Sequence, residues 1–97
     1  MRIVHDTFIC KPGNASKLAK LFKEVMGGDP SMLHVMTDMT GQWHRVIMVS
    51  QFESLTAYER SWDKYMEDSE ENRKMNEQMK DVNEMYVSGN REIFKVW

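Results

Sequence analysis

The strand-like segments of this chain carry apolar side chains at both odd and even positions, and this pattern constrains the fold most. Residues 2–10 place Ile3 and Val4 on opposite faces, and segments 31–39 and 43–52 repeat the pattern. A strand with one face in water alternates apolar and polar residues, whereas a strand covered on both faces is almost continuously apolar. The chain has too few helical segments to cover both faces of a sheet. We therefore expect a second copy of the chain to cover one of them.

The length and charge of the chain narrow its class. Ninety-seven residues correspond to one domain, residues 1–97. The net charge is −2 and no basic patch is interleaved with aromatic residues, so no nucleic-acid partner is expected. No apolar run approaches the ~20 residues of a membrane span, so no membrane partner is expected either. The single cysteine, Cys10, excludes an internal disulfide and suits a reducing compartment, which predicts a cytoplasmic protein.

Two amphipathic helical patterns separate the strand-like segments. Apolar residues spaced by three and four positions follow Asn14, and the glycines 27–28 end that helix. The second helix begins near Ser54 or Thr56 and is expected to bend or restart at the acidic residues 67–71. The predicted order is strand, helix, strand, strand, helix, strand, with strands at 2–10, 31–39, 43–52 and 91–97, a hairpin tip at 40–42, and the second helix ending at 88–90.

This order predicts a ferredoxin-like α+β fold of the βαββαβ type. Its two halves form one four-stranded antiparallel sheet with strand order 4-1-3-2. Right-handed crossovers place both helices on the same face and leave the other face open. Packing two open faces together would bury their apolar side chains in a two-fold homodimer.

Several motifs resemble the dimeric α/β-barrel superfamily, in the branch that holds NIPSNAP-like and antibiotic-biosynthesis-monooxygenase-like proteins. They are the strand ending in Lys11-Pro12-Gly13, the helix after it, and the passage from the third strand into the segment Phe52-Glu53-Ser54-Leu55-Thr56-Ala57-Tyr58. The resemblance covers nearly the whole chain and implies that two ferredoxin-like domains form a dimeric α/β barrel. It indicates the fold better than the activity, because the superfamily includes oxygenases, isomerases, haem enzymes and proteins of unknown role.

The resemblance also implies where a ligand would bind. In monooxygenase-type members the ligand lies between the helices and the sheet, beside a polar residue of the first strand and an aromatic residue of the second helix. Asp6 and Trp62 fall near these positions. Haem-degrading members use a histidine in the later helical region, and residues 54–88 contain none. This argues against haem bound in the same way, and no other cofactor is predicted.

Asp6 is the candidate catalytic residue, because a carboxylate among apolar neighbours must be paired, solvated by a cavity, or shifted in pKa. As a general base it could take a proton from a phenol or carbon acid. The alternative is that Asp6 bonds a neighbouring arginine, tyrosine or backbone group and does no chemistry. The candidate ligand-binding residues are aromatic, and the alternative for them is a place in the core; they are Tyr58, Trp62, Phe8 and Phe22.

Methionines and histidines suggest two further possibilities. The ten methionines fit either a pliable core and interface or a pocket that reshapes around an apolar ligand. Met32, His34 and Met36 are expected on one face of a strand, and thioether and imidazole groups suit Cu(I). No paired-cysteine or His-x-x-x-His spacing supports a metal site, so none is predicted.

Two functions of different classes remain open at this point. The first is a small dimeric protein that binds a small apolar or aromatic molecule between helices and sheet. Its enzymatic version is a cofactor-independent monooxygenase. The second is a non-catalytic NIPSNAP-like module for dimerisation or partner contact.

Overall fold

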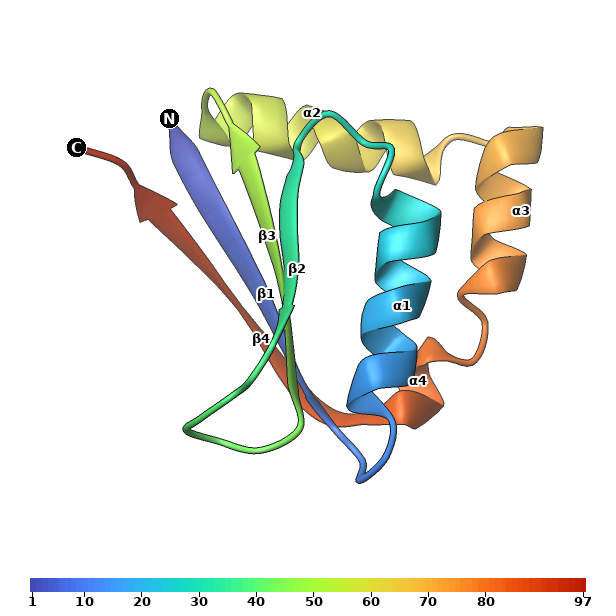
Figure 1. Cartoon of the computed structure of the whole chain (residues 1–97). Coiled ribbons are helices and arrows are strands. Elements are labelled where there is room, and N and C mark those ends of the chain that lie inside the picture. Colours follow the sequence, from blue (N-terminus) through green and yellow to red (C-terminus); the bar gives the residue numbers. More distant parts are fainter.

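A four-stranded antiparallel sheet with helices on one face forms the fold, in a computed structural model that describes residues 1–97 (Figure 1). The strand order is β2-β3-β1-β4, which confirms the predicted ferredoxin-like α+β arrangement. The elements are β1 (Arg2–Cys10), α1 (Ala15–Met26), β2 (Met32–Thr37), β3 (Arg45–Phe52), α2 (Leu55–Met66), α3 (Glu70–Gln78), α4 (Val82–Met85) and β4 (Tyr86–Lys95).

The core lies between α1 and the helix-facing side of the sheet. Leu18 and Phe22, one turn apart on α1, are buried against Val46 and Met48 of β3. Val82 of α4 closes the same cluster. The stripe spacing in the sequence thus identifies the face of α1 that packs on the sheet.

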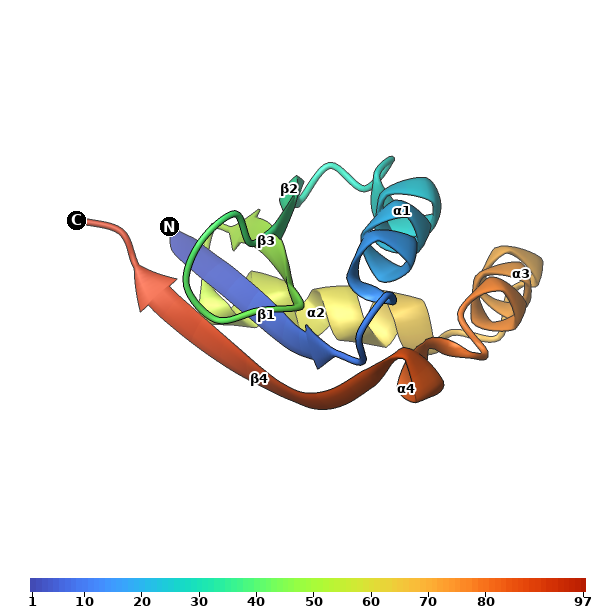
Figure 2. The ribbon, with the colours of Figure 1, turned by 60° about the horizontal axis from the view of Figure 1, so that its bottom comes forward.

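The helical region after β3 is broken where the acidic stretch predicted a break. Ser54 caps α2 by accepting a hydrogen bond from the amide of Ala57, so Ser54 and not Thr56 is the N-cap. Helix α2 ends at Met66, and its C-cap residue Glu67 has an extended backbone. Ser69 then caps α3, and acidic residues in the first turn favour this new helix N-terminus. Figure 2 shows α2 behind the strands, while α3 lies on the far side of α1 from the sheet.

The last strand begins earlier than predicted. Strand β4 starts at Tyr86 and ends at Lys95, so residues 88–90 lie within the strand and do not end a helix. Gly89 is paired with Phe8 of β1, and a Cβ at Gly89 would lie 3.2 Å from the carbonyl oxygen of Thr7. Glycine here allows the neighbouring strand β1 to approach closely. A glycine after a helical pattern can therefore mark a close contact within a strand as well as the end of a helix.

The β2–β3 connection is longer than the predicted hairpin, and β2 contains a bulge. Asp38 accepts a hydrogen bond from the amide of Arg45, so both strands end short of the tip. The pairing register shifts between Met32 and His34, which places Met32 against the core and His34 on the opposite face. The expectation that Met32, His34 and Met36 share one face is therefore wrong, and the Cu(I) site that depended on it is not formed.

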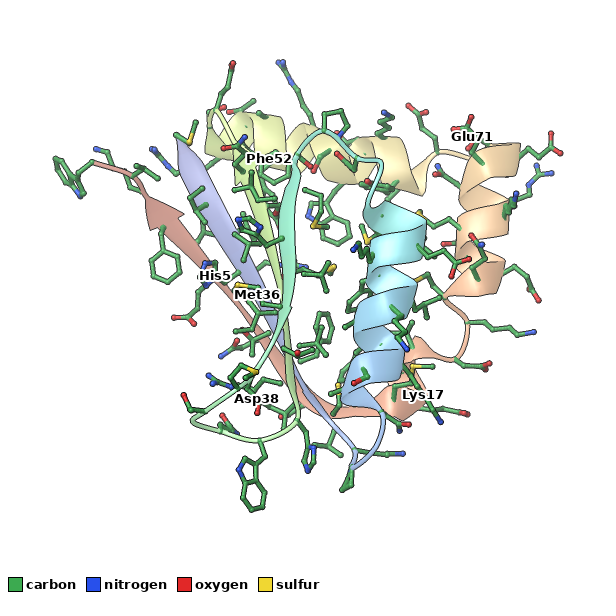
Figure 3. The ribbon with its side chains drawn as sticks, viewed as in Figure 1. His5, Lys17, Met36, Asp38, Phe52 and Glu71 are labelled. Atoms are coloured by element: carbon green, nitrogen blue, oxygen red, sulfur yellow. The ribbon has the colours of Figure 1, made fainter.

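The sheet face away from the helices, here called the open face, carries a mixture of apolar and polar side chains. Figure 3 shows His5 and Met36 on this side. His5 packs edge-on against Phe94, with ring centroids 5.2 Å apart. The pairing register adds Ile3, Ile47 and Val49 as apolar members and Thr7, Asn90 and Glu92 as polar members. No element of this chain covers the open face, as the sequence pattern predicted (Figure 1).

We expect Leu18→Ala to lower the free energy of unfolding by about 3 kcal/mol, because it leaves a cavity in a fully buried cluster. Leu55→Ala is the matched control, because Leu55 is also helical but 53% exposed, and it should change stability by less than about 0.5 kcal/mol. Urea unfolding of both variants measures the difference. Equal losses would show that the core does not lie under α1.

Candidate functional site

A cavity of about 350 Å³ lies between the helices and the sheet, here called the helix–sheet cavity. Every helix and strand of the fold contributes a side chain to its wall, and the loop between α1 and β2 contributes two more. The lining residues include Asp6, Phe8, Phe22, Asp29, Ser31, Ser50, Phe52, Tyr58, Ser61, Trp62, Tyr65, Asn76, Val82 and Arg91. Figure 3 shows Phe52 at the end of β3, beneath α2. Phe52 is one of the aromatic residues of the cavity wall.

The remaining six residues of the cavity wall are all methionines. Six of the ten methionines line the cavity: Met26, Met32, Met48, Met66, Met75 and Met79. The thioether side chain is flexible and polarisable, so a wall built of it adapts to the outline of an apolar molecule. Met48 also belongs to the buried core, and Met26, Met32 and Met79 pack against it, so the placement fits both a pliable core and an adaptable pocket.

One end of the cavity is polar and is built around an ion pair. Asp6 of β1 lies opposite Arg91 of β4 in the strand register, and Arg91 Nε donates to Asp6 Oδ1 over 2.5 Å. The Asp6 side chain is 16% exposed and that of Arg91 is 42% exposed. The guanidinium carbon of Arg91 lies 4.9 Å from the ring centroid of Trp62 and 5.8 Å from that of Tyr58. The pair and the two rings fix the guanidinium from different sides.

The Tyr58 hydroxyl is buried and has no hydrogen-bond partner within the chain. Its ring is held edge-on between Phe52 and Trp62, with centroids 5.1 and 6.3 Å away. Buried hydroxyls in folded proteins are nearly always hydrogen-bonded, so a lone one requires an explanation. A bound molecule or water with an oxygen acceptor would satisfy this group.

A second polar group lies where α2 meets the loop between α1 and β2. Tyr65 donates a hydrogen bond to Asp29 Oδ2, while the amide and hydroxyl of Ser31 donate to Asp29 Oδ1 at 2.9 and 2.8 Å. Burial alone would raise the pKa of Asp29, but hydrogen bonds from Tyr65 and Ser31 outweigh it and lower that pKa. Burial and the bond to Asp29 raise the pKa of Tyr65 to about 12.

The structure brings all five sequence-predicted site residues to this one cavity, while their roles stay a prediction. Asp6 stands at the polar end, with Tyr58 and Trp62 beside it. Phe8 and Phe22 pack together with centroids 5.1 Å apart, and Phe22 is fully buried, so it forms the floor. Asp6 is ion-paired with Arg91, as expected if it does no chemistry. The cavity beside it is nevertheless open and lined by aromatic side chains, as expected for a ligand site.

Three polar residues of the site were missed by sequence reasoning. Arg91 was assigned only to a strand, and nothing in the sequence shows that it faces Asp6 until the register of β1 with β4 is known. Nothing in the sequence marks Asp29, which follows the glycines 27–28, or Tyr65, in the second helical pattern, as a site residue. Their contact joins positions 36 residues apart, so no local spacing could indicate it.

Other chemistry-bearing features do not form a comparable site. A hollow of about 460 Å³ lies on the open face, but only two of its ten lining residues are hydrophobic. Burial raises the pKa of the Cys10 thiol, which makes it a poor nucleophile. No three His, Cys, Asp or Glu side chains gather where they could hold a metal ion. No helix has the length and apolarity required to cross a bilayer.

Solved structures of NIPSNAP-domain proteins share this fold. An uncharacterized NIPSNAP domain protein from Burkholderia xenovorans superposes with a TM-score of 0.79 at 7% identity, covering 100% of this chain and 95% of that chain. A NIPSNAP family protein from Agrobacterium tumefaciens gives a TM-score of 0.79 at 12% identity, covering 96% and 82%. An antibiotic biosynthesis monooxygenase-like protein from Deinococcus radiodurans gives 0.63 at 14% identity, covering 100% and 93%.

These similarities confirm, at the level of fold, the resemblance seen in the sequence. The chain has the ferredoxin-like α+β fold found in NIPSNAP-domain and antibiotic biosynthesis monooxygenase-like proteins. No protein-family model matches the sequence, and no curated protein matches it. The fold alone does not assign an activity, so function must be argued from the cavity.

We expect Tyr65→Phe to lower stability by about 1 kcal/mol at pH 7 through loss of one hydrogen bond. The raised pKa of Tyr65 means that the folded state keeps this proton longer than the unfolded state. The contribution is therefore complete below pH 10 and is lost as the pH rises toward about 12. The pKa of Asp29 is lowered in the folded state, so the stabilising contribution of its hydrogen bonds is complete above about pH 3.8. That contribution is lost as the pH falls below this value and the carboxylate is protonated.

Urea unfolding of wild type and Tyr65→Phe between pH 3 and pH 11 measures this difference. The gap between the two proteins should narrow at both ends of the range. A gap that stays constant from pH 7 to pH 11 would show that the Tyr65–Asp29 hydrogen bond does not contribute to stability as expected.

Proposed function

We propose that the protein binds a small, flat, mainly apolar molecule in the helix–sheet cavity. The observation that carries this proposal is an apolar cavity containing a buried hydroxyl, that of Tyr58, without a partner. Ligand pockets combine a mainly hydrophobic wall with a few placed polar groups, and their volumes start at about 300 Å³. The helix–sheet cavity meets both conditions, with 13 hydrophobic residues among its 20 lining residues.

The shape of the polar end favours a flat molecule. Tyr58 and Trp62 stand nearly perpendicular, at 89°, and form a corner rather than a closed stack. Trp62 is 43% exposed, which leaves ring surface open for contact. Aromatic rings prefer offset or edge-on neighbours, so a molecule of roughly two or three fused rings would find both geometries in this corner.

A cofactor-independent oxygenase is the enzymatic version of this proposal. It is supported by a carboxylate, Asp6, at the end of an apolar cavity, which is where a general base for a phenol would stand. Asp6 Oδ1 is engaged by Arg91, and only Oδ2 remains for a proton. Binding is therefore the primary proposal. Conversion of 1-naphthol and O2 to 1,4-naphthoquinone and water, with one oxygen atom of the quinone taken from labelled O2, would establish the reaction. The rate should exceed that without protein and be lost in Asp6→Asn.

Methionine methyl resonances provide the test of binding. We expect 2-naphthol or menadione to shift the methyl signals of Met48, Met75 and Met79, which line the cavity, through ring currents. Met39, on the β2–β3 loop and 96% exposed, should not move and serves as the internal control. Absence of cavity-specific shifts with naphthol, naphthoquinone and flavin probes would exclude the proposal.

We expect Trp62→Ala to weaken binding about tenfold, because it removes one wall of the aromatic corner. Trp43→Ala is the matched control, because Trp43 lies on the β2–β3 loop outside the cavity and is 76% exposed. Dissociation constants from the same methyl shifts make the comparison. Equal affinities for the two variants would place the ligand elsewhere.

The second candidate is a dimerisation or interaction module, and the open face supports it. Ile3, Ile47 and Phe94 lie on that face with no covering element. Large exposed apolar patches on a sheet mark interfaces. Packing of two such faces gives a two-fold homodimer whose helices remain outside, so this proposal is compatible with ligand binding on the other side of the sheet.

We expect sedimentation velocity to show a dimer for wild type and a monomer for Ile47→Lys, because a buried lysine would oppose the packing of two open faces. Leu55→Lys is the matched control, because Leu55 lies on the helical side and is exposed. Circular dichroism confirms that both variants fold. A wild-type chain that stays monomeric at high micromolar concentration would contradict the dimer.

A further inference from the structure

We propose that Asp6 sets the charge preference of the helix–sheet cavity. Paired with Arg91, it makes the cavity select an uncharged ligand with a carbonyl oxygen over the carboxylate analogue of the same shape. The inference rests on the proposed binding function and goes beyond it, because it names the ligand class and assigns Asp6 a specificity-determining role instead of a catalytic one.

The polar end of the cavity has more donors than acceptors. A guanidinium carries five N–H donors, and only the Nε of Arg91 donates within the chain, to Asp6. The Nη groups have no acceptor in the chain, and the Tyr58 hydroxyl has no partner. A ligand that meets Arg91 and Tyr58 must therefore offer an acceptor oxygen. A hydrocarbon would leave the buried Tyr58 hydroxyl without a partner.

Charge distinguishes between the two common planar acceptors, carbonyl and carboxylate. An arginine without a counter-ion favours a carboxylate strongly, often through two parallel hydrogen bonds. Asp6 Oδ1 lies 2.5 Å from Arg91 Nε and already balances that charge. The only other charged group in the wall is the carboxylate of Asp29. A bound carboxylate would be the third negative group beside one positive group, and it would also lose its hydration.

The charge balance is built into the sheet. Residues 6 and 91 are direct partners in the β1–β4 ladder, so the backbone pairing brings the two side chains together. The ring of Trp62 lies 4.9 Å from the Arg91 guanidinium and limits its movement away from Asp6. A ligand therefore meets an ion pair of zero net charge whose arginine still has free N–H donors. A carbonyl oxygen can accept from these donors without bringing another negative charge into the cavity.

The test compares three naphthalenes of similar shape: 2-acetylnaphthalene, 2-naphthoate and unsubstituted naphthalene. Affinities are measured at pH 7 from methionine methyl shifts. Wild type should bind the ketone about tenfold or more tighter than the carboxylate. Asp6→Asn keeps the shape but frees the charge of Arg91, so the preference should reverse in favour of 2-naphthoate. Asp63→Asn removes the same charge from the exposed side of α2 and should leave the wild-type preference unchanged.

A second variant, Arg91→Gln, keeps the proposal testable if Asp6→Asn does not fold. It removes most of the donors, so the ketone should lose its advantage over naphthalene. Equal binding of ketone and carboxylate by wild type, or an unchanged preference in folded Asp6→Asn, would overturn the inference and leave the binding function standing. Failure of all three naphthalenes to bind any folded variant would overturn the binding function as well.

Discussion

The alternation of side chains along the β1–β4 ladder is the constraint on which both surfaces of this protein depend. Asp6 faces the helices and pairs with Arg91, while its neighbour His5 faces the open side opposite Glu92. One ladder thus builds the polar end of the cavity and part of the open face at once. A slip of one residue would put His5 into the cavity and Asp6 on the open face, so the register decides the chemistry of both.

The fold was predictable from the sequence because hydrophobic periodicity reports burial directly. The stripe around Leu18 and Phe22 identified α1, and the strands with two apolar faces indicated a sheet that α1 and α2 cover on one side only. Hydrophobic periodicity does not indicate the role of a glycine or the position of a bulge in a strand. Gly89 resembles a helix terminator but lies within β4, and the bulge beside Met32 reverses which side chains face the core.

The candidate site was predictable in its aromatic part and not in its polar part. Tyr58 and Trp62 are four residues apart on one helix, so their proximity follows from helix geometry. The contact between Asp6 and Arg91 spans 85 positions and depends on how the last strand pairs with the first. A carboxylate in an apolar strand indicates that some partner or cavity exists. It does not indicate which residue is the partner, and here the structure has both a partner and a cavity.

Helices α2 and α3, which line the cavity, differ from α1 in the contacts that attach them to the rest of the fold. Neither α2 nor α3 has a buried residue, whereas α1 buries two large side chains. The contact of Tyr65 with Asp29 joins α2 to the rest of the fold through a polar group, and apolar surface beneath it faces the cavity. A ligand there would add apolar contacts to the few that α2 makes with the sheet, such as the packing of Tyr58 against Phe52. The proposed ligand would therefore stabilise α2 and α3, because a molecule that binds only the folded state stabilises that state.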